Sequence, residues 1–125
     1  MYTSARETIV TFLLAAGCEV VEAVDGETAM DILVKRDGID VVFTDIRLSG
    51  KLNGWDVGET SRATYSDMPV IYTSGDAITA ERRVKGSIFL EKPYELAAVL
   101  AACQTLSGKR DPLPIRVGEG TDDAC

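Results

Sequence analysis

Short apolar runs alternate along most of the chain with stretches in which apolar residues recur at helical spacing. Residues Ser4 to Glu7 fit a capping box, so a first helix is predicted to begin near Ser4 and to end at Gly17. The run at 20–24 is short and rich in valine, which predicts a strand. The later elements predicted in the same way are a helix capped by Asp25 and ended before Gly38, a strand at 41–43 closed by Thr44 and Asp45, a loop at 47–53, a helix at 54–62, a strand at 69–73, a short helix at 79–84, a strand at 87–90 and a helix at 94–106 closed by Gly108.

This alternation of helices and strands predicts an α/β fold with a parallel sheet, because each strand is joined to the next through a helix. The strands are continuous apolar runs, as expected when helices cover both faces of the sheet. From residue 109 onward the composition shifts toward proline, glycine and aspartate. We therefore predict one domain at 1–108 and a flexible C-terminal tail at 109–125, in which Leu113 and residues 115–117 form a small strand-like island.

Composition and charge narrow the class of protein further. With 125 residues, 46% of them hydrophobic, the chain has the composition of a single globular domain. The net charge of −7 indicates that nucleic acid is not a partner. The absence of histidine excludes Ser-His-Asp hydrolases and histidine-ligated zinc sites. No apolar run is long enough to span a membrane and no signal peptide opens the chain, so we expect a cytoplasmic protein without a membrane partner.

Three polar residues lie at the predicted carboxyl ends of successive strands: Asp45, Thr73 and Lys92. In an open parallel sheet these ends meet at one edge, where ligands bind. Each residue alone has a commoner explanation, as a loop residue, a turn hydroxyl or a surface charge. Together they suit an aspartyl phosphate. The carboxylate can be the nucleophile, the ammonium can pair with the phosphoryl charge, and the hydroxyl can donate to a phosphoryl oxygen.

Four ordered motifs surround these residues: Val41-Val42-Phe43-Thr44-Asp45, a loop ending at Gly54, Pro69-Val70-Ile71-Tyr72-Thr73-Ser74-Gly75, and Phe89-Leu90-Glu91-Lys92-Pro93-Tyr94. The set resembles the response-regulator receiver domain of bacterial two-component signalling and covers about residues 4–107. The resemblance implies a flavodoxin-like fold, in which a doubly wound parallel sheet has helices on both faces.

The resemblance also implies a role for each site residue. Asp45 matches the phosphoacceptor and Lys92 matches the lysine of the Lys-Pro motif. Thr73 and Phe89 match the hydroxyl and the aromatic ring of a two-state switch. Asp45 and the backbone carbonyl of Arg47 would bind Mg²⁺, and the phosphoryl donor would be a phosphohistidine on a sensor histidine kinase or a histidine phosphotransfer protein. Such a chain is not a dedicated enzyme, although its aspartyl phosphate can turn over by self-catalysis.

One feature of the family is missing before the first helix. Receiver domains open with an apolar strand, usually central in the sheet, that ends in an acidic pair, and no such segment stands here. We therefore expect a receiver without its first strand, in which Mg²⁺ binding is weakened because only Asp45 and one carbonyl remain. The central position could be closed by direct pairing of the strands around Val21 and Val42, filled by the tail island, or filled by a strand exchanged within a homodimer. We rank direct pairing first, because the alternation with Pro114 and Arg116 suits an edge strand better than a buried centre.

Because no output domain follows, we expect a stand-alone receiver that accepts a phosphoryl group on Asp45. The alternative is a pseudo-receiver, a protein-binding module that is never phosphorylated, which the missing acidic pair favours. A third interpretation is an unrelated doubly wound enzyme or nucleotide binder. It would require a glycine-rich phosphate loop, and Gly17 and Gly26 do not form one.

Overall fold

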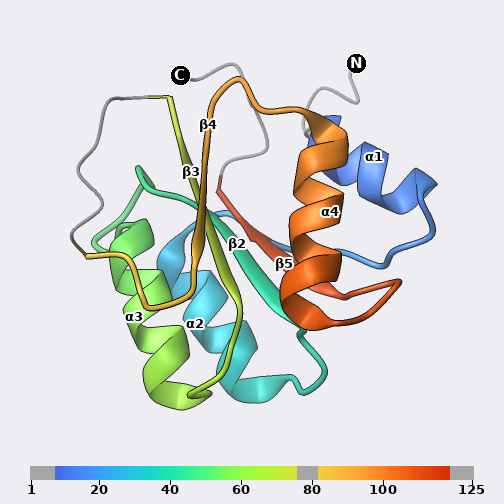
Figure 1. Cartoon of the computed structure of the whole chain (residues 1–125). Helices are drawn as coiled ribbons and strands as arrows, with labels where there is room; N and C mark the ends of the chain where they lie inside the picture. The colour runs from blue at the N-terminus through green and yellow to red at the C-terminus, as the bar shows by residue number, and fades with distance from the viewer. Residues whose placement is uncertain (1–7, 76–81, 119–125) are drawn as a thin grey trace.

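The computed structural model, which describes residues 8–75 and 82–118, is a five-stranded parallel sheet with helices on both faces (Figure 1). Its strand order is β1-β5-β2-β3-β4, and each neighbouring pair is parallel. The predicted fold class, a doubly wound parallel sheet, is therefore confirmed, while the predicted helix start near Ser4 lies outside the described residues. In chain order the elements are α1 (Thr8–Ala15), β1 (Val21–Ala23), α2 (Gly26–Lys35), β2 (Val41–Asp45), α3 (Gly54–Thr64), β3 (Val70–Ser74), β4 (Ile88–Glu91), α4 (Leu96–Ser107) and β5 (Pro114–Val117).

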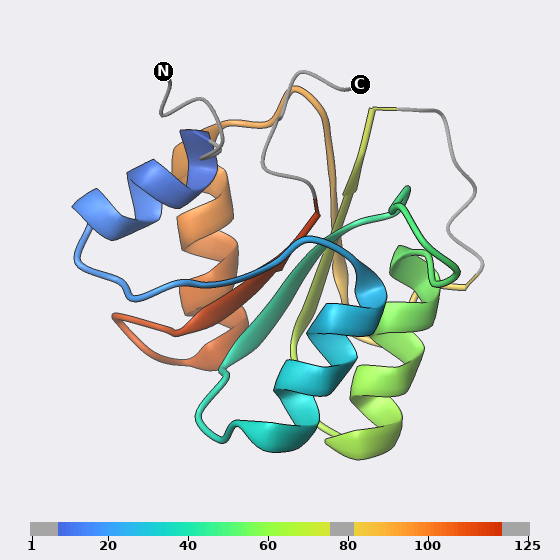
Figure 2. The same ribbon diagram turned by 180° about the vertical axis from the view of Figure 1, so that it is seen from behind.

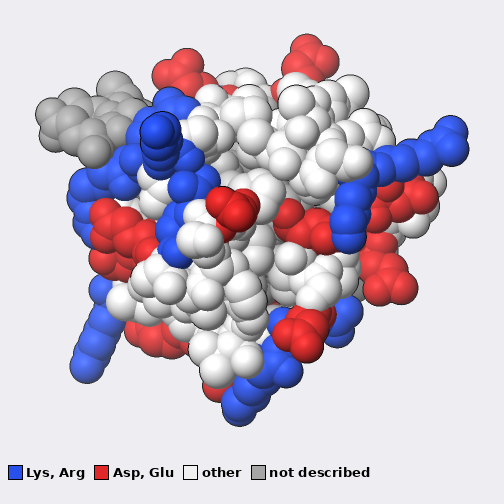
Figure 3. Space-filling view, turned by 60° about the horizontal axis from the view of Figure 1, so that its bottom comes forward, with Lys and Arg blue, Asp and Glu red and all other residues white. Residues whose placement is uncertain are grey.

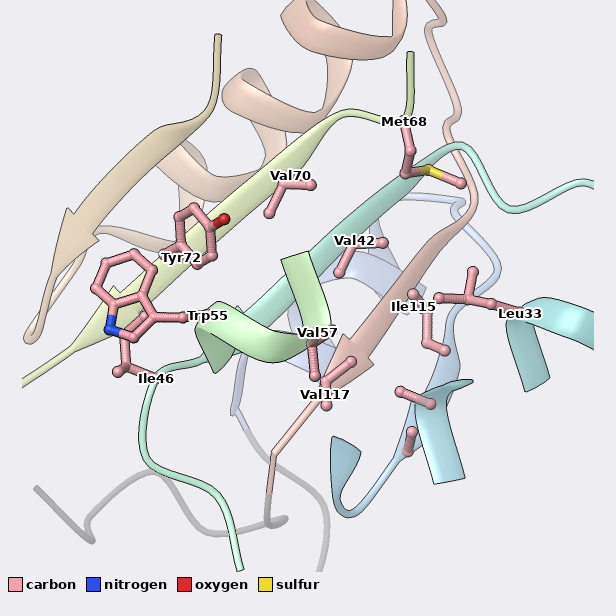
Figure 4. Packing of buried hydrophobic residues seen from close by; sticks show 12 residues of the cluster. Leu33, Val42, Ile46, Trp55, Val57, Met68, Val70, Tyr72, Ile115 and Val117 are labelled. Carbon is pink, nitrogen blue, oxygen red and sulfur yellow. The ribbon is translucent and has the colours of Figure 1, made fainter. Parts of the chain in front are cut away.

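Two helical layers enclose the sheet. The helices α2 and α3 cover one face, and α1 and α4 cover the other (Figure 2). Successive residues of β2 divide between these faces: Val42 packs in the cluster under α2 and α3, while Val41 and Phe43 pack under α1 and α4. Figure 4 shows the first cluster, in which Ile115 of β5 lies with Val42 and Leu33. Burial on both faces explains why the strands are continuous apolar runs.

Local sequence sets the ends of three helices close to their predicted positions. The Asp25 carboxylate caps α2 by accepting a 2.8 Å hydrogen bond from the backbone nitrogen of Thr28. Asn53 and Asp56 form a capping box at the start of α3. The helix α4 ends before Gly108, whose φ of 72° is the left-handed conformation that glycine adopts readily.

The segment before β4 differs from its prediction. A short helix was expected at 79–84, but residues 79–81 lie outside the described residues and residues 82–84 are not helical. Instead, the Arg82 guanidinium contacts Asp56 at 2.9 Å and Glu59 at 2.7 Å, both on α3. These contacts hold the chain against α3 as it returns to the sheet.

The C-terminal strand β5 corrects two predictions. The ranking of direct pairing between β1 and β2 is wrong, because β5 lies between them, with Ile115 in register with Val21 on one side and Val42 on the other. The prediction of a flexible tail at 109–125 is likewise wrong for its described part. Ile115 and Val117 are fully buried and fill the central position between β1 and β2. These side chains cover the apolar faces, and the pairing of β5 with β1 and β2 satisfies the backbone groups of both neighbouring strands.

The alternation of residues in β5 was interpreted as typical of an edge strand, and this too is wrong. Arg116, at the centre of the sheet, exposes only 2% of its surface. Its guanidinium carbon lies 4.5 Å from the centre of the Phe43 ring, a cation–π contact that covers part of the charged group. Pro114 stands at the first position of the strand, where the missing N–H is tolerated.

Asp40 connects the start of β5 to the start of β2. Its backbone nitrogen donates to the Leu113 carbonyl at 2.8 Å, and its carboxylate accepts a 2.8 Å hydrogen bond from the Leu113 nitrogen. The Lys109 ammonium lies 2.8 Å from the other carboxylate oxygen. This residue therefore helps to fix which residue of β5 stands opposite which residue of β2.

Charged side chains of both signs stand next to one another on the face shown in Figure 3. That face gives no support to an interface with nucleic acid, which would require clustered Lys and Arg. Within residues 8–75 and 82–118, no helix has the length and apolar character needed to cross a membrane.

Candidate functional site

The carboxyl ends of β2, β3, β4 and β5 place the candidate site at one edge of the sheet. Asp45 is the last residue of β2 and stands in register with Thr73 of β3. The backbone nitrogen of Ile46 donates to the Thr73 carbonyl at 3.0 Å, so the pairing continues beyond the carboxylate. The Asp45 side chain is 13% exposed, so it is mostly buried but still reached by solvent.

Lys92 lies beside Asp45, as predicted. Its Nζ is 3.4 Å from Asp45 Oδ1, and its side chain is 11% exposed. The backbone nitrogen of Lys92 donates to the Ser74 carbonyl at 2.9 Å, which anchors the residue just past the end of β4. The structure thus brings together the predicted nucleophile and the predicted cation, which are 47 positions apart in the sequence.

Thr73 is at the predicted place but is engaged elsewhere. Its side chain is buried, and its hydroxyl donates to the Leu90 carbonyl of β4 at 2.6 Å. To serve a phosphoryl group at Asp45, this hydroxyl must exchange that carbonyl for a phosphoryl oxygen. The predicted role of Thr73 therefore requires a rearrangement at the ends of β3 and β4.

Phe89 belongs to the opposite face of the sheet. It stands in register with Tyr72 and packs against the cluster that contains Trp55 and Tyr72, whereas Leu90, in register with Thr73, packs against the α1 and α4 cluster. Burial raises the pKa of the Tyr72 hydroxyl in this cluster. The predicted coupling between the Thr73 hydroxyl and the Phe89 ring stays a prediction.

Sequence reasoning missed the nearest cation to the candidate nucleophile. Arg116 Nη2 lies 2.8 Å from Asp45 Oδ1, closer than Lys92, and Arg116 Nη1 donates to the Val117 carbonyl at 2.7 Å. The only signal in the sequence was the alternation of Ile115, Arg116 and Val117, which indicates that the arginine faces away from the α2 and α3 cluster. That signal does not identify its partner, which comes from a strand 71 residues earlier.

Gly118 was also missed. It has a φ of 151°, and a Cβ atom built on it would lie 2.3 Å from Asp45 Oδ2. No residue with a side chain fits there without moving the Asp45 carboxylate. The backbone after β5 therefore covers one carboxylate oxygen, while Arg116 and Lys92 contact the other.

The described residues at this site do not suit Mg²⁺, the metal that the resemblance implies. Mg²⁺ in proteins is held by one or two carboxylates together with waters and phosphate oxygens. Here the single carboxylate, Asp45, is in contact with two cationic side chains, and residues 8–75 and 82–118 contain no group of three acidic, histidine or cysteine residues that could hold a metal ion. The backbone carbonyl of Arg47 would be the only other predicted ligand. A divalent ion placed beside Asp45 would be repelled by Arg116 and Lys92.

Comparison with known proteins identifies the family. The model of the response regulator receiver domain matches residues 3–104, and the chain belongs to that family. The match ends before β5, so the strand that completes the sheet and carries Arg116 lies outside the matched region. The matched region includes each of the predicted site residues from Asp45 to Lys92. No match was found among curated proteins.

Solved structures agree with this assignment. A response regulator receiver protein from Sinorhizobium medicae WSM419 is 28% identical, with a TM-score of 0.66 over 75% of this chain and 97% of that one. A two component transcriptional regulator AraC from Clostridium phytofermentans ISDg shares the fold at 24% identity, with a TM-score of 0.55 over 66% of this chain and 65% of that one. Receiver domains are the phosphoacceptors of two-component signalling, generally interact with histidine kinases or phosphotransfer proteins, and typically bind Mg²⁺.

Proposed function

We propose that this receiver domain accepts a phosphoryl group on Asp45 from a phosphohistidine of a partner sensor histidine kinase or histidine phosphotransfer protein. The observation that carries the proposal is the pair formed by Asp45 at the end of β2 and Lys92 just past β4, with Nζ 3.4 Å from Oδ1. A carboxylate at a sheet edge is an ordinary surface group, but one beside a largely buried lysine side chain is prepared to receive an anionic phosphoryl group.

The transfer uses groups of this chain. A carboxylate oxygen of Asp45 attacks phosphorus as the phosphorus–nitrogen bond of the donor breaks, and the electron pair of that bond remains on the imidazole nitrogen. Lys92 then pairs with the phosphoryl oxygens, and the Thr73 hydroxyl leaves the Leu90 carbonyl to donate to one of them. Loss of that hydrogen bond would loosen the contact between β3 and β4, which is where a signal to a partner would begin.

The proposed transfer does not use Mg²⁺, because the described residues at the site do not suit this ion. The chain acts in the proposal as a phosphoacceptor with self-catalysed turnover of its aspartyl phosphate, and not as a dedicated enzyme. Hydrolysis returns the carboxylate and releases inorganic phosphate.

The test is phosphorylation of the purified chain with acetyl phosphate, followed by intact mass and by mapping of the modified residue. We expect one phosphoryl group per chain, located on Asp45, and none on the variant D45N. The matched control is D67N, which removes an exposed carboxylate at the other end of the sheet and should be labelled like the wild type. Mapping of the group to Asp40 or Asp56 would contradict the proposal.

A second candidate function, a pseudo-receiver that binds a partner without phosphorylation, is favoured by one observation. Asp45 is already paired with Arg116 at 2.8 Å, and Gly118 lies against its second oxygen. If this arrangement is permanent, the carboxylate is a structural group and no phosphodonor will modify it. The absence of labelling by both acetyl phosphate and a phosphorylated histidine phosphotransfer protein would support this function over the first.

A further inference from the structure

We propose that the Arg116 guanidinium takes, beside Asp45, the place of a divalent cation, so that phosphorylation of Asp45 does not depend on metal. This inference rests on the proposed function, in which Asp45 is the phosphoacceptor. It concerns a residue outside the region that matches the receiver family and a role that the family resemblance does not give to any residue of this chain.

The geometry holds the guanidinium in one position. Arg116 Nη2 is 2.8 Å from Asp45 Oδ1, Nη1 donates to the Val117 carbonyl at 2.7 Å, and the guanidinium carbon lies 4.5 Å from the centre of the Phe43 ring. The residue is 2% exposed and is part of a central strand. A cation fixed before the reaction needs no reorganisation when charge develops, which is the condition for strong electrostatic stabilisation. The planar fork of arginine also matches phosphoryl oxygens in shape.

The balance of charge around Asp45 supports the same conclusion. Before transfer, Asp45 carries one negative charge against the two positive charges of Arg116 and Lys92. After transfer, the carboxylate is an acyl phosphate whose phosphoryl group carries about two negative charges. Both side chains are within reach of Asp45 and can pair with the phosphoryl group, and a further cation beside them would be repelled. The two cations in contact with Asp45 therefore suit the phosphorylated state.

Because Arg116 is buried, its guanidinium needs an anionic partner both before and after phosphoryl transfer. An arginine stays protonated at any physiological pH, and a buried guanidinium requires an anionic partner to offset its lost hydration. Asp45 is such a partner before transfer, and the phosphoryl group bonded to Asp45 can be one afterwards. The transfer itself is balanced without a co-reactant. With acetyl phosphate, a bond forms between an Asp45 oxygen and phosphorus, the bond from phosphorus to the acetyl oxygen breaks, and acetate leaves with the electron pair.

The first experiment measures metal dependence in the wild-type protein. The initial rate of Asp45 labelling by acetyl phosphate is compared in excess EDTA and in millimolar Mg²⁺. We expect the two rates to agree. Labelling that occurs with Mg²⁺ and disappears in EDTA would overturn the inference while leaving the proposed function intact. No labelling under either condition would instead contradict the proposed function and, with it, the inference that rests on it.

The second experiment does not depend on phosphorylation. Mn²⁺ prefers the same oxygen ligands as Mg²⁺, and its free concentration can be followed by its electron paramagnetic resonance signal. We expect the wild type and D45N to take up the same amount of Mn²⁺. A site of submillimolar affinity that is present in the wild type and absent in D45N would show a metal at Asp45 and would overturn the inference.

The third experiment changes the cation itself. We expect R116Q to lose about 100-fold in labelling rate, as when one preorganised donor is removed from a charged transition state. R116K, which keeps the charge, should recover part of this loss, as should ethylguanidinium added to R116A. The matched control R110Q removes an exposed arginine just before β5 and should be labelled like the wild type. Equal labelling of R116Q and the wild type would overturn the inference. If R116Q does not fold, the first two experiments, which do not alter Arg116, still test the inference.

Discussion

The neighbouring strands β2 and β5 occupy equivalent central places in the sheet but have very different sequences. β2 is an apolar run that ends in the carboxylate of Asp45, and its pattern predicts a buried strand. β5 is four residues long, begins with Pro114 and places Arg116 in the middle of the protein. All four residues of β5 are nevertheless buried. The comparison shows that a polar residue can stand in a central strand when the neighbouring strand supplies its partner.

Each strand depends on the other at the carboxyl edge of the sheet. Asp45 alone would be a carboxylate near one lysine, and Arg116 alone would be a buried charge with a large desolvation cost. Their contact at 2.8 Å gives the carboxylate a second cationic neighbour and gives the buried guanidinium an anionic one. This contact lies at the candidate site. We therefore expect changes in β5 to alter both the stability of the protein and the candidate site.

Removal of β5 should have the largest effect. Truncation after Arg110 deletes a central strand, exposes the apolar faces of β1 and β2 and should abolish cooperative unfolding, because a typical domain has only about 5–15 kcal/mol of net stability to lose. Circular dichroism and urea denaturation would measure this. The matched control is truncation after Gly118, which keeps every residue of β5. Cooperative unfolding of the shorter chain at an unchanged midpoint would show that β5 is not an essential part of the sheet.

Truncation of a single core side chain should show whether β5 is packed as well as β2. Ile115 and Val42 are register partners, and both are fully buried in the same cluster. We expect I115A to lower the free energy of unfolding by about 2–5 kcal/mol, the usual cost of such a cavity. V42A, which removes fewer atoms, serves as the reference from β2. If I115A costs much less than V42A in urea denaturation, β5 is only loosely held in its central place.

The ion pair between the strands can be measured by a double-mutant cycle with D45N and R116M. Each single change leaves the other group buried with a poorer set of partners, whereas the double variant removes both charges. We expect a coupling free energy of about 2 kcal/mol, in the range found for residues in direct contact. A coupling near zero would indicate that the contact of 2.8 Å contributes nothing to folding.

The smallest effect is expected at the start of the two strands. D40A removes the acceptor for the Leu113 nitrogen and should cost about 1 kcal/mol, the net value of one hydrogen bond. K109A removes the exposed partner of the same carboxylate and should cost less, about 0–0.5 kcal/mol, as is usual for surface pairs. Equal losses of stability in the two variants would show that Asp40 stabilises the protein through its ion pair with Lys109 and not through its hydrogen bond to β5.

Much of the fold and part of the site followed from the sequence by itself, because the signals involved are local. Apolar runs identified β2 and β3, and the Asp25 cap and Gly108 set two helix ends. The order of strands and helices implied a parallel sheet, and the carboxyl ends of parallel strands share one edge. The sequence therefore predicts that Asp45 and Lys92 lie together, and in the structure the two side chains are in contact.

Only the tertiary structure decided the place of β5 and the roles of Arg116 and Gly118. Residues 109–118 have the composition of a tail, and nothing in their local pattern names a partner. Whether a short strand enters a sheet depends on the vacancy between two other strands, which is a property of the whole chain. Whether an arginine can be buried depends on an anion within reach, and here that anion is 71 residues away in sequence. Energies of burial and of ion pairing are set by such distant neighbours, so the sequence predicted the carboxylate and its lysine but not the guanidinium between the strands.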